Sequence, residues 1–535
     1  MSESGRGLSF RAQAVAATVV RALGRWCREK PGRVLLACAT LLLMTCALRD
    51  LAVRLAYEAR GPFSTDAPIY SAIGRGILNH VPLYSGMFET KPPLIFLLFA
   101  LSWKTCGSWA LATDIQVAAI VAIFFAPLLL VYRERSSIRN LPRKVALAIL
   151  GGACVALYTA VRAGEIQAES FGAAALLPWI LVCSRHPDRP PEATLGRLLL
   201  GSASVAVAVM TKEPFLLAAI AVGLVNARSR RDWVEFALMV GLAGLLAALA
   251  LAVTGAAHGY LGVYLPQMLG HVAFSKAPLR TGSLLVRTLE LTHLWDDLWS
   301  YAPGLCVALT AASLSAMAVE RREGRPALSM LIRWALALFV TSFAIGLSGF
   351  YYRHQYVFLV PLAMAILMAW LLTDTAPSGK LIAFSSAAAA LGLAVATISH
   401  DRPDLDAELA SSRGRAASAK TAATQIDRAL DCTGETRYAY VGGAGVQPWG
   451  WTKHSPLGPW FFQYVAWFPA SEKQRRAELL NALKQARLVV FRGLSAGDFD
   501  EPFRKAIDAR FQPGLPPKCA SIALAGPWTF RWAAD

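Results

Sequence analysis

Long apolar runs separated by short basic segments dominate residues 33–398. The hydrocarbon core of a bilayer is about 30 Å thick, so a helix needs about 20 apolar residues to cross it. The pattern therefore predicts a mainly α, polytopic helical membrane domain. We expect about eleven spans, near 33–53, 110–132, 144–162, 169–184, 196–210, 214–227, 234–257, 301–319, 331–349, 355–373 and 380–398.

Lysine and arginine residues cluster between these runs. Cytoplasmic loops carry an excess of both residues, so each cluster is predicted to lie inside. This topology requires that the apolar stretch 92–106 does not cross, and we expect it to form a membrane-lying or re-entrant helix within an outer loop, 54–109. The basic N-terminus, 1–32, is then cytoplasmic. The later clusters lie at 133–144, 185–197, 228–231 and 321–333.

The character of the chain changes near residue 399. The segment 399–535 is charged and rich in turn residues, and it predicts a small α/β domain joined by a helical linker at 407–423. An odd number of spans places this domain outside the cytoplasm. Strand-like runs lie at 437–441, 487–491, 521–525 and 529–532, and helix-like runs at 471–485 and 500–510.

Cys432 and Cys519 are the only cysteines of the C-terminal segment. The outer compartment of a bacterium is oxidising, so we expect a disulfide between them. Two buried free thiols are the alternative. The full chain has nine cysteines, without a CxxC motif or a Cys/His cluster, and this pattern does not indicate a structural zinc site.

Composition separates this chain from soluble basic proteins. It is 55% hydrophobic and 16% charged over 535 residues, which excludes a single soluble core. The net charge of +18 would suggest a nucleic-acid partner in a soluble protein. Here the positive residues lie in loops between spans, so we expect membrane lipid and no nucleic acid as a partner.

The remaining ionisable residues at span ends gather on the predicted outer side. Such residues near the hydrocarbon boundary usually face a cavity or one another, so we expect one outward-facing charged cavity. They are Asp66, Arg75, Glu89, Lys91, Glu165, Glu169, Lys212, Glu213, His271, Lys276, Arg353 and His354.

The first outer loop contains several of these residues. Asp66 alone is equally suited to cap a helix expected at 67–78, with Pro68 near its first turn. Arg75 and Lys91 could likewise extend toward lipid headgroups. None of them indicates an enzyme by itself.

Taken together, this loop resembles a known family. Asp66, Tyr70, Pro82-Leu83-Tyr84 and Lys91-Pro92-Pro93-Leu94 are similar to the first-loop pattern of GT-C membrane glycosyltransferases, in the group of protein O-mannosyltransferases and the lipid A aminoarabinose transferase. That family usually has an Asp-Glu pair, whereas here Ala67 follows Asp66. The departure affects only the second acid.

Three further segments extend the resemblance. Glu169 lies where the family has a second acidic residue, and Thr211-Lys212-Glu213-Pro214 resembles its Thr-Lys-x-Pro hairpin. The run from Phe350 to Tyr356, which contains Tyr352, Arg353 and His354, is similar to its Arg/Tyr-rich entry to a late span. The resemblance implies a GT-C-like fold over most of the membrane region.

The resemblance also implies a reaction. Such enzymes move one sugar from a polyprenyl phosphate to an extracytoplasmic lipid, glycan or protein, here with inversion at the anomeric carbon. Asp66 would be the general base. Lys91 and Arg353, with Lys212 and Arg75 in reserve, would bind the donor phosphate. Glu169 and Glu89 would orient hydroxyl groups or hold these cations, and Tyr84 and Tyr352 would contact substrate.

Other residues are expected to be structural. These are Glu165, His271, Lys276 and His354, together with Trp449, Trp451, Trp460 and Trp467, for which an aromatic core is favoured over a sugar-stacking surface. No certain cofactor is implied, although carboxylates around a phosphate could hold a divalent cation.

The alternatives to a glycosyltransferase of this kind are a lipid-linked glycan ligase or polymerase and a transporter or flippase. We expect a multi-pass protein of the bacterial inner membrane, with the site and C-terminal domain on the periplasmic side.

Overall fold

The computed structural model describes a large part of the chain. The described residues are 45, 66–136, 138, 141–162, 166–184, 194–227, 229–274, 327–347, 353–372, 405–441, 448–459, 461, 472–492, 501–522, 524 and 528–533. The predicted spans at 301–319 and 380–398, and all of 33–53 except Thr45, lie outside them.

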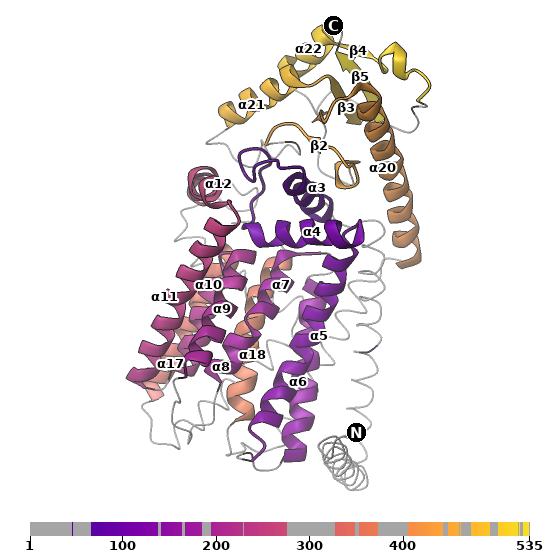
Figure 1. Cartoon of the computed structure of the whole chain (residues 1–535). Helices are drawn as coiled ribbons and strands as arrows, with labels where there is room; N and C mark the ends of the chain where they lie inside the picture. The colour runs from indigo at the N-terminus through magenta and orange to yellow at the C-terminus, as the bar shows by residue number, and fades with distance from the viewer. Residues whose placement is uncertain are drawn as a thin grey trace, which may run out of the picture.

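A bundle of apolar helices forms the lower part of the molecule in Figure 1. Its helices end within a few residues of the predicted spans. They are α5 (Ala110–Arg133), α6 (Leu141–Arg162), α7 (Ala168–Ala175), α8 (Leu177–Cys183), α9 (Leu195–Thr211), α10 (Phe215–Asn226), α11 (Arg230–Val253), α17 (Ala327–Gly346) and α18 (Leu359–Leu371). The 3-10 helix η2 (Arg353–Phe358) leads into α18.

Three segments of the described chain are long and apolar enough to cross a membrane. They are Ala110–Arg133, Arg230–Val253 and His354–Leu371, and the other apolar helices are shorter. The expected total of about eleven spans therefore stays a prediction. Within the bundle, small residues allow close helix contact, as at Gly172, where a Cβ atom would collide with the ring of Phe215.

Two helices of the predicted outer loop lie across one end of the bundle. In Figure 1, α3 (Asp66–Leu78) and α4 (Pro93–Cys106) cover this end, and α4 runs crosswise to the bundle helices. Proline at the first position of α4 and Gly107, with φ +61°, at its C-cap limit it to 14 residues. This helix does not run along the bundle helices, and its expected position in the membrane surface stays a prediction.

The C-terminal segment contains a small sheet. The strands have the order β2-β1-β3-β5-β4, with β1 parallel to β2 and β3, and β5 antiparallel to β3 and β4. The strands are β1 (Arg437–Val441), β2 (Ser455–Pro456), β3 (Leu488–Arg492), β4 (Phe511–Pro513) and β5 (Trp528–Ala533). Helices α20 (Leu405–Thr433), α21 (Glu472–Gln485) and α22 (Glu501–Arg510) accompany them, with the 3-10 helices η3 (Pro448–Gly450) and η6 (Pro517–Cys519).

Most predicted elements of this segment are confirmed. The strands predicted at 437–441, 487–491 and 529–532 and both predicted helices are present within one or two residues. The strand predicted at 521–525 is wrong, because residues 521, 522 and 524 lie in turn or irregular structure. Strands β2 and β4 are two and three residues long, too short to show an alternating pattern in the sequence.

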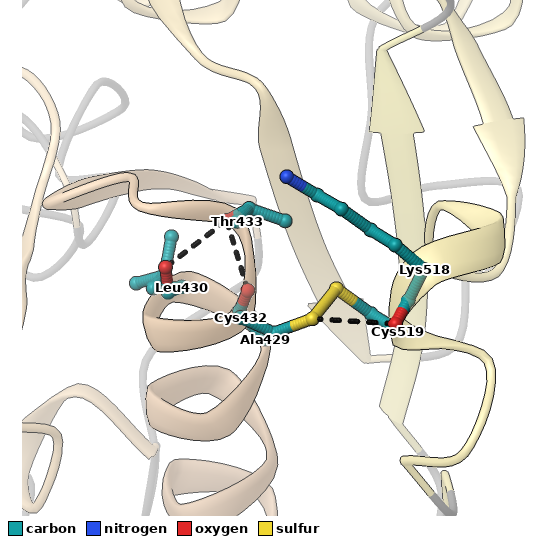
Figure 2. Close-up of a disulfide and its surroundings, with 6 residues drawn as sticks. All are labelled: Ala429, Leu430, Cys432, Thr433, Lys518 and Cys519. Carbon is teal, nitrogen blue, oxygen red and sulfur yellow. Dashed lines mark hydrogen bonds between the residues drawn. A yellow bond between two sulfur atoms is a disulfide. The ribbon is translucent and has the colours of Figure 1, made fainter.

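A disulfide fastens the last turn of α20 to η6 (Figure 2). It joins Cys432 and Cys519, the pairing expected from the sequence, across a Cα–Cα distance of 6.1 Å. The bond closes a loop with a sequence separation of 87 residues, so it connects the start and the end of the C-terminal segment.

The outer helices and the C-terminal segment share one hydrophobic core, and we call them together the cap. Ser71 Oγ donates a hydrogen bond of 2.6 Å to the carbonyl of Gly450, and Phe88 N donates one of 2.9 Å to the carbonyl of Pro459. Trp449 is fully buried in this core, as expected for an aromatic core residue. The bundle has a separate core, so the cap and the bundle meet at a seam.

Candidate functional site

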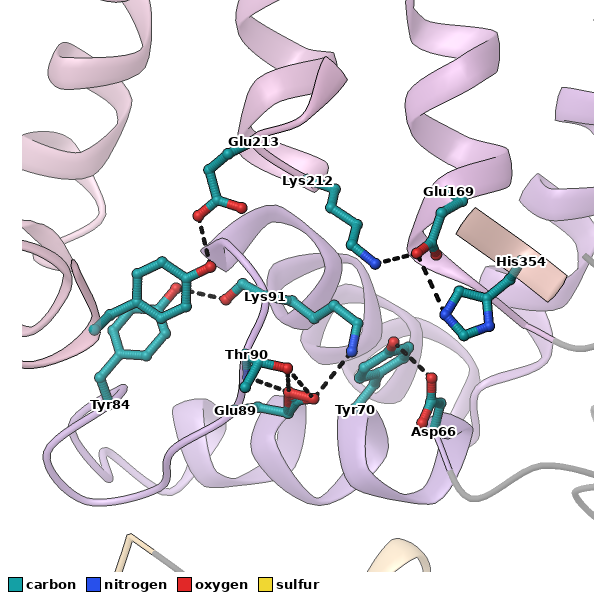
Figure 3. A network of polar contacts seen from close by, with 11 residues as sticks. Asp66, Tyr70, Tyr84, Glu89, Thr90, Lys91, Glu169, Lys212, Glu213 and His354 are labelled. Atoms are coloured by element: carbon teal, nitrogen blue, oxygen red, sulfur yellow. Dashed lines mark hydrogen bonds and ion pairs between the residues drawn. The ribbon is translucent and has the colours of Figure 1, made fainter. Parts of the chain in front are cut away.

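Polar side chains from both bodies converge at this seam (Figure 3). The α3 helix and the loop before α4 supply residues from the cap. The start of α7, the C-terminal end of α9 and the start of η2 supply residues from the bundle. The group consists of Asp66, Tyr70, Glu89 and Lys91 from the cap, and Glu169, Lys212 and His354 from the bundle.

Lys91 lies at the centre of the cap group. Its Nζ is 3.0 Å from Oε1 of Glu89 and 5.4 Å from the ring centre of Tyr70, and only 9% of the side chain is exposed. Burial disfavours the ammonium ion, but the carboxylates of Glu89, Asp66 and Glu169 outweigh it and raise the pKa of Lys91 above its ordinary value. Lys91 is therefore a buried, permanent cation.

The loop before α4 places Lys91 through its backbone. Tyr84 has a φ of +68° and its amide donates to the carbonyl of Met87, which turns the chain back toward α4. The hydroxyl of Tyr84 then donates a hydrogen bond of 2.9 Å to the carbonyl of Lys91. Pro92 and Pro93 follow and begin α4. The expected substrate residue Tyr84 thus contacts the Lys91 backbone.

Asp66 is the first residue of α3 and is partly exposed. A carboxylate is favourable at a helix N-terminus, so the capping and the catalytic interpretations are compatible. The hydroxyl of Tyr70, one turn later, donates to Oδ2 of Asp66 at 3.3 Å. Burial and the neighbouring Asp66 raise the pKa of Tyr70, so the phenol keeps its proton and orients the carboxylate.

The bundle supplies an ion pair on the other side of the seam from Lys91. Lys212 Nζ donates to Oε1 of Glu169, and Nε2 of His354 lies 3.6 Å from the same oxygen. The Glu169 side chain is fully buried, and within the described part of the chain no group donates a hydrogen bond to its Oε2. One carboxylate oxygen of Glu169 is therefore buried without a hydrogen-bond donor among the described residues. Electrostatic interactions connect Lys91 with this carboxylate.

Not every predicted residue joins this group. The guanidinium of Arg75 stacks 4.2 Å over Trp103 and interacts with Asp427 of α20, on the side of the C-terminal segment. Arg353 is the first residue of η2, next to His354. Tyr352, Glu165 and Lys276 lie outside the described residues.

Two members of the group received no role from the sequence. His354 was expected to be structural, yet it lies beside Glu169. Its position next to Arg353 in the Tyr-rich motif was the available signal. Tyr70 was part of the first-loop motif, and its spacing of four residues from Asp66 places both on one helix face.

The described residues do not form a metal centre from side chains alone. Among the described residues no three His, Cys, Asp or Glu side chains are grouped as ligands. Glu169 and His354 are a pair of suitable type. A divalent cation at the seam would need a phosphate or another ligand to complete its coordination.

Comparison with known proteins gives a match in structure. No protein-family model and no curated protein matches the chain. The crystal structure of ArnT from Cupriavidus metallidurans bound to undecaprenyl phosphate is similar, with a TM-score of 0.52, 15% identity, and coverage of 92% of this chain and 97% of that chain. The apo structure of the same protein gives a TM-score of 0.50 at the same identity and coverage. The chain therefore has the fold of ArnT, which confirms the expected GT-C-like architecture at the level of the fold.

Proposed function

We propose that this protein is an integral membrane glycosyltransferase that moves one sugar from a polyprenyl-phosphate donor to an extracytoplasmic acceptor. The observation that carries the proposal is the position of two lysines, the buried Lys91 and the partly exposed Lys212, on opposite sides of the seam, each paired with a carboxylate. The shared fold supports it, because the ArnT structure contains undecaprenyl phosphate.

The two lysines suit a lipid phosphate. When the bond from the anomeric carbon to the phosphate oxygen breaks, negative charge develops on the leaving phosphate. Lys91 and Lys212 would neutralise that charge in a site from which most water is excluded, where electrostatic stabilisation is strong. Arg353, next in sequence to His354, would supply a third cation for the same phosphate.

The carboxylates divide the remaining tasks. Asp66, partly exposed and oriented by Tyr70, would take the proton from the acceptor nucleophile as it attacks the anomeric carbon with inversion. Oε2 of Glu169 would accept a hydrogen bond from a sugar hydroxyl. Glu89 holds Lys91 in place.

The basic ends of the bundle helices set the proposed orientation. Arg133, at the end of α5, lies at the opposite end of the bundle from the seam. The excess of positive charge there favours the cytoplasmic side. The site and the cap would then face the periplasm of a bacterial inner membrane.

The test uses the full-length protein in detergent micelles. Undecaprenyl phosphates carrying different single sugars are supplied with a membrane lipid extract, and released undecaprenyl phosphate is measured. We expect release by the wild type and loss of about 10²- to 10⁴-fold in Asp66→Asn, the range for general-base catalysis. Asp114→Asn, which changes an exposed carboxylate on α5, is the matched control.

Two outcomes would contradict this assignment. A folded Asp66→Asn variant with wild-type turnover removes Asp66 from the mechanism. Absence of sugar transfer with every donor, together with movement of the lipid across vesicle membranes, would favour the transporter alternative. Transport is measured in vesicles because micelles have no second compartment to receive a transported lipid.

A further inference from the structure

A further carboxylate, that of Glu213, lies beside the site without a role in the proposed reaction. Oε1 of Glu213 accepts hydrogen bonds from the hydroxyl of Tyr264 at 2.5 Å and from that of Tyr260 at 3.1 Å. The two rings are stacked, with centres 4.8 Å apart. We call Glu213, Tyr260 and Tyr264 the tyrosine clamp.

The clamp starts at the residue next to Lys212. Lys212 has an extended backbone, with φ −162° and ψ 125°, at the end of α9, and Pro214 follows Glu213. In Figure 3 the two neighbouring side chains diverge, and Lys212 points toward Glu169. Glu213 instead accepts its hydrogen bonds from Tyr260 and Tyr264. Holding Glu213 therefore holds the backbone from which Lys212 extends.

The same clamp reaches Lys91 from its other side. The ring of Tyr264 lies 4.8 Å from that of Tyr84, whose hydroxyl donates to the Lys91 carbonyl at 2.9 Å. Gly259 brings this segment against the loop, since a Cβ atom there would collide with the carbonyl of Leu83. A chain of contacts thus connects Lys212 with Lys91.

Two features separate the clamp from ordinary packing. Tyr260–Tyr264 form η1, a π-helix between α12 (Ala257–Gly259) and α13 (Leu265–Phe274). Such helices are rare in proteins overall, and those that occur are often found at functional sites. The side chain of Glu213 is partly exposed, yet desolvation of the carboxyl raises its pKa although the hydrogen bonds from both phenols oppose the shift.

We propose that the tyrosine clamp is a positioning device that sets the spacing of Lys91 and Lys212 for a lipid phosphate. The inference rests on the proposed function, which makes these lysines the donor-phosphate ligands. The clamp residues are positioning residues, because they contact the elements that bear the lysines.

The test is a double-mutant cycle on binding of undecaprenyl phosphate to the full-length protein in micelles. The variants are Tyr264→Phe, Lys212→Ala and the two combined, and Lys91→Ala is measured in parallel. Tyr438→Phe is the matched control, because its buried hydroxyl contacts Thr452 in the C-terminal segment at 3.2 Å, remote from both lysines. Glu213→Gln, which keeps the side-chain shape, is a second probe of the clamp.

We expect Tyr264→Phe to weaken binding about tenfold, the scale of one hydrogen bond to a charged group. In the Lys212→Ala background the same change should weaken binding less, because only the contact toward Lys91 through Tyr84 remains for the clamp to act on. The unfolding temperature of the Tyr264→Phe variant should equal that of the Tyr438→Phe variant. Glu213→Gln should weaken binding without lowering the unfolding temperature.

The outcomes separate the two proposals. If Lys91→Ala and Lys212→Ala bind undecaprenyl phosphate as the wild type does, the donor site is wrong and the clamp has nothing to position. If the lysine variants lose binding but Tyr264→Phe and Glu213→Gln do not, only the clamp is wrong. Equal losses from Tyr264→Phe with and without Lys212 would also overturn it.

Discussion

The two ends of the helical bundle use positive side chains in different ways. At the end remote from the cap, cations donate to backbone carbonyls at the C-termini of neighbouring helices. At the seam, Lys91 and Lys212 are paired with carboxylates. The cations of the remote end are Arg133, which donates to Leu181 and Ser184, Lys144 to Trp370, Arg197 to Val182, and Arg333 to Ala227.

The physical reason lies in the direction of the helices. The last four carbonyls of a helix lack partners within it, and positive charge near a C-terminus is favourable. Helices α5, α8, α10 and α18 all end on the remote side, where the basic clusters lie. The residues that are predicted to set membrane orientation therefore also complete the helix ends. Cations at the seam have carboxylate partners that a phosphate could replace.

The largest expected effect concerns the disulfide that fastens the cap. By contrast, Cys106 in α4 and Cys183 in the bundle are free cysteines and form no crosslink. Replacing Cys432 and Cys519 by serine should destabilise the cap by about 4–5 kcal/mol, the entropic estimate for a loop of this length. Limited proteolysis of the full chain in urea measures it. A cap that resists proteolysis as well as the wild type would show that its core alone is sufficient.

Lys91→Ala should lower the rate of sugar transfer about 10²- to 10³-fold, because it removes one stabilising group for the leaving phosphate and leaves Glu89 buried and unpaired. Initial rates at varied donor concentration measure the loss. The control is Lys104→Ala, an exposed lysine of α4. Equal activity of the two variants would contradict the functional role of the seam cations.

Arg133→Ala should lower stability by about 1–2 kcal/mol, because the carbonyls of Leu181 and Ser184 lose a charged donor that is partly exposed. Activity per folded molecule should not change. Thermal unfolding in micelles measures the shift, against Arg135→Ala, whose guanidinium stacks on Tyr132. Loss of activity without loss of stability would remove the distinction between the two ends.

The smallest effect is a pH dependence at Glu213. Because burial raises the pKa of this carboxyl in the folded state, the folded protein binds its proton more tightly than the unfolded chain. Its contribution to stability must therefore fall as the pH rises from the unfolded value, about 4.5, through the folded value. Glu213→Gln should gain stability relative to the wild type over that range. A constant difference from pH 4 to 8 would contradict this.

Much of the secondary structure could be predicted from residue patterns. The helix α5 and the crosswise helix α4 follow from the length of their apolar runs and from the prolines and glycine at the ends of α4. Strands β1 and β3 were visible as apolar runs, whereas β2 exists only because Ser455 and Pro456 pair with β1. Such short strands depend on their neighbours and leave no period in the sequence.

The candidate site was predictable only in part. Local motifs singled out Asp66, Lys91 and Lys212, since each lies in a short segment with a recognisable spacing. His354 beside Glu169, and Tyr264 beside Glu213, join segments far apart in the chain. Arg75 is close to Asp66 in the sequence but far from it in role, because both lie on α3 while Arg75 stacks on Trp103, on the side of the C-terminal segment.

The sequence by itself determined the apolar helices, the basic loops between them and the motifs of the outer loop. These properties depend on composition and on spacings within a few turns of chain. Only the tertiary structure decided which charges face each other across the seam and which tyrosines hold Glu213. Such pairs depend on the packing of the cap against the bundle, and that contact depends on many residues at once.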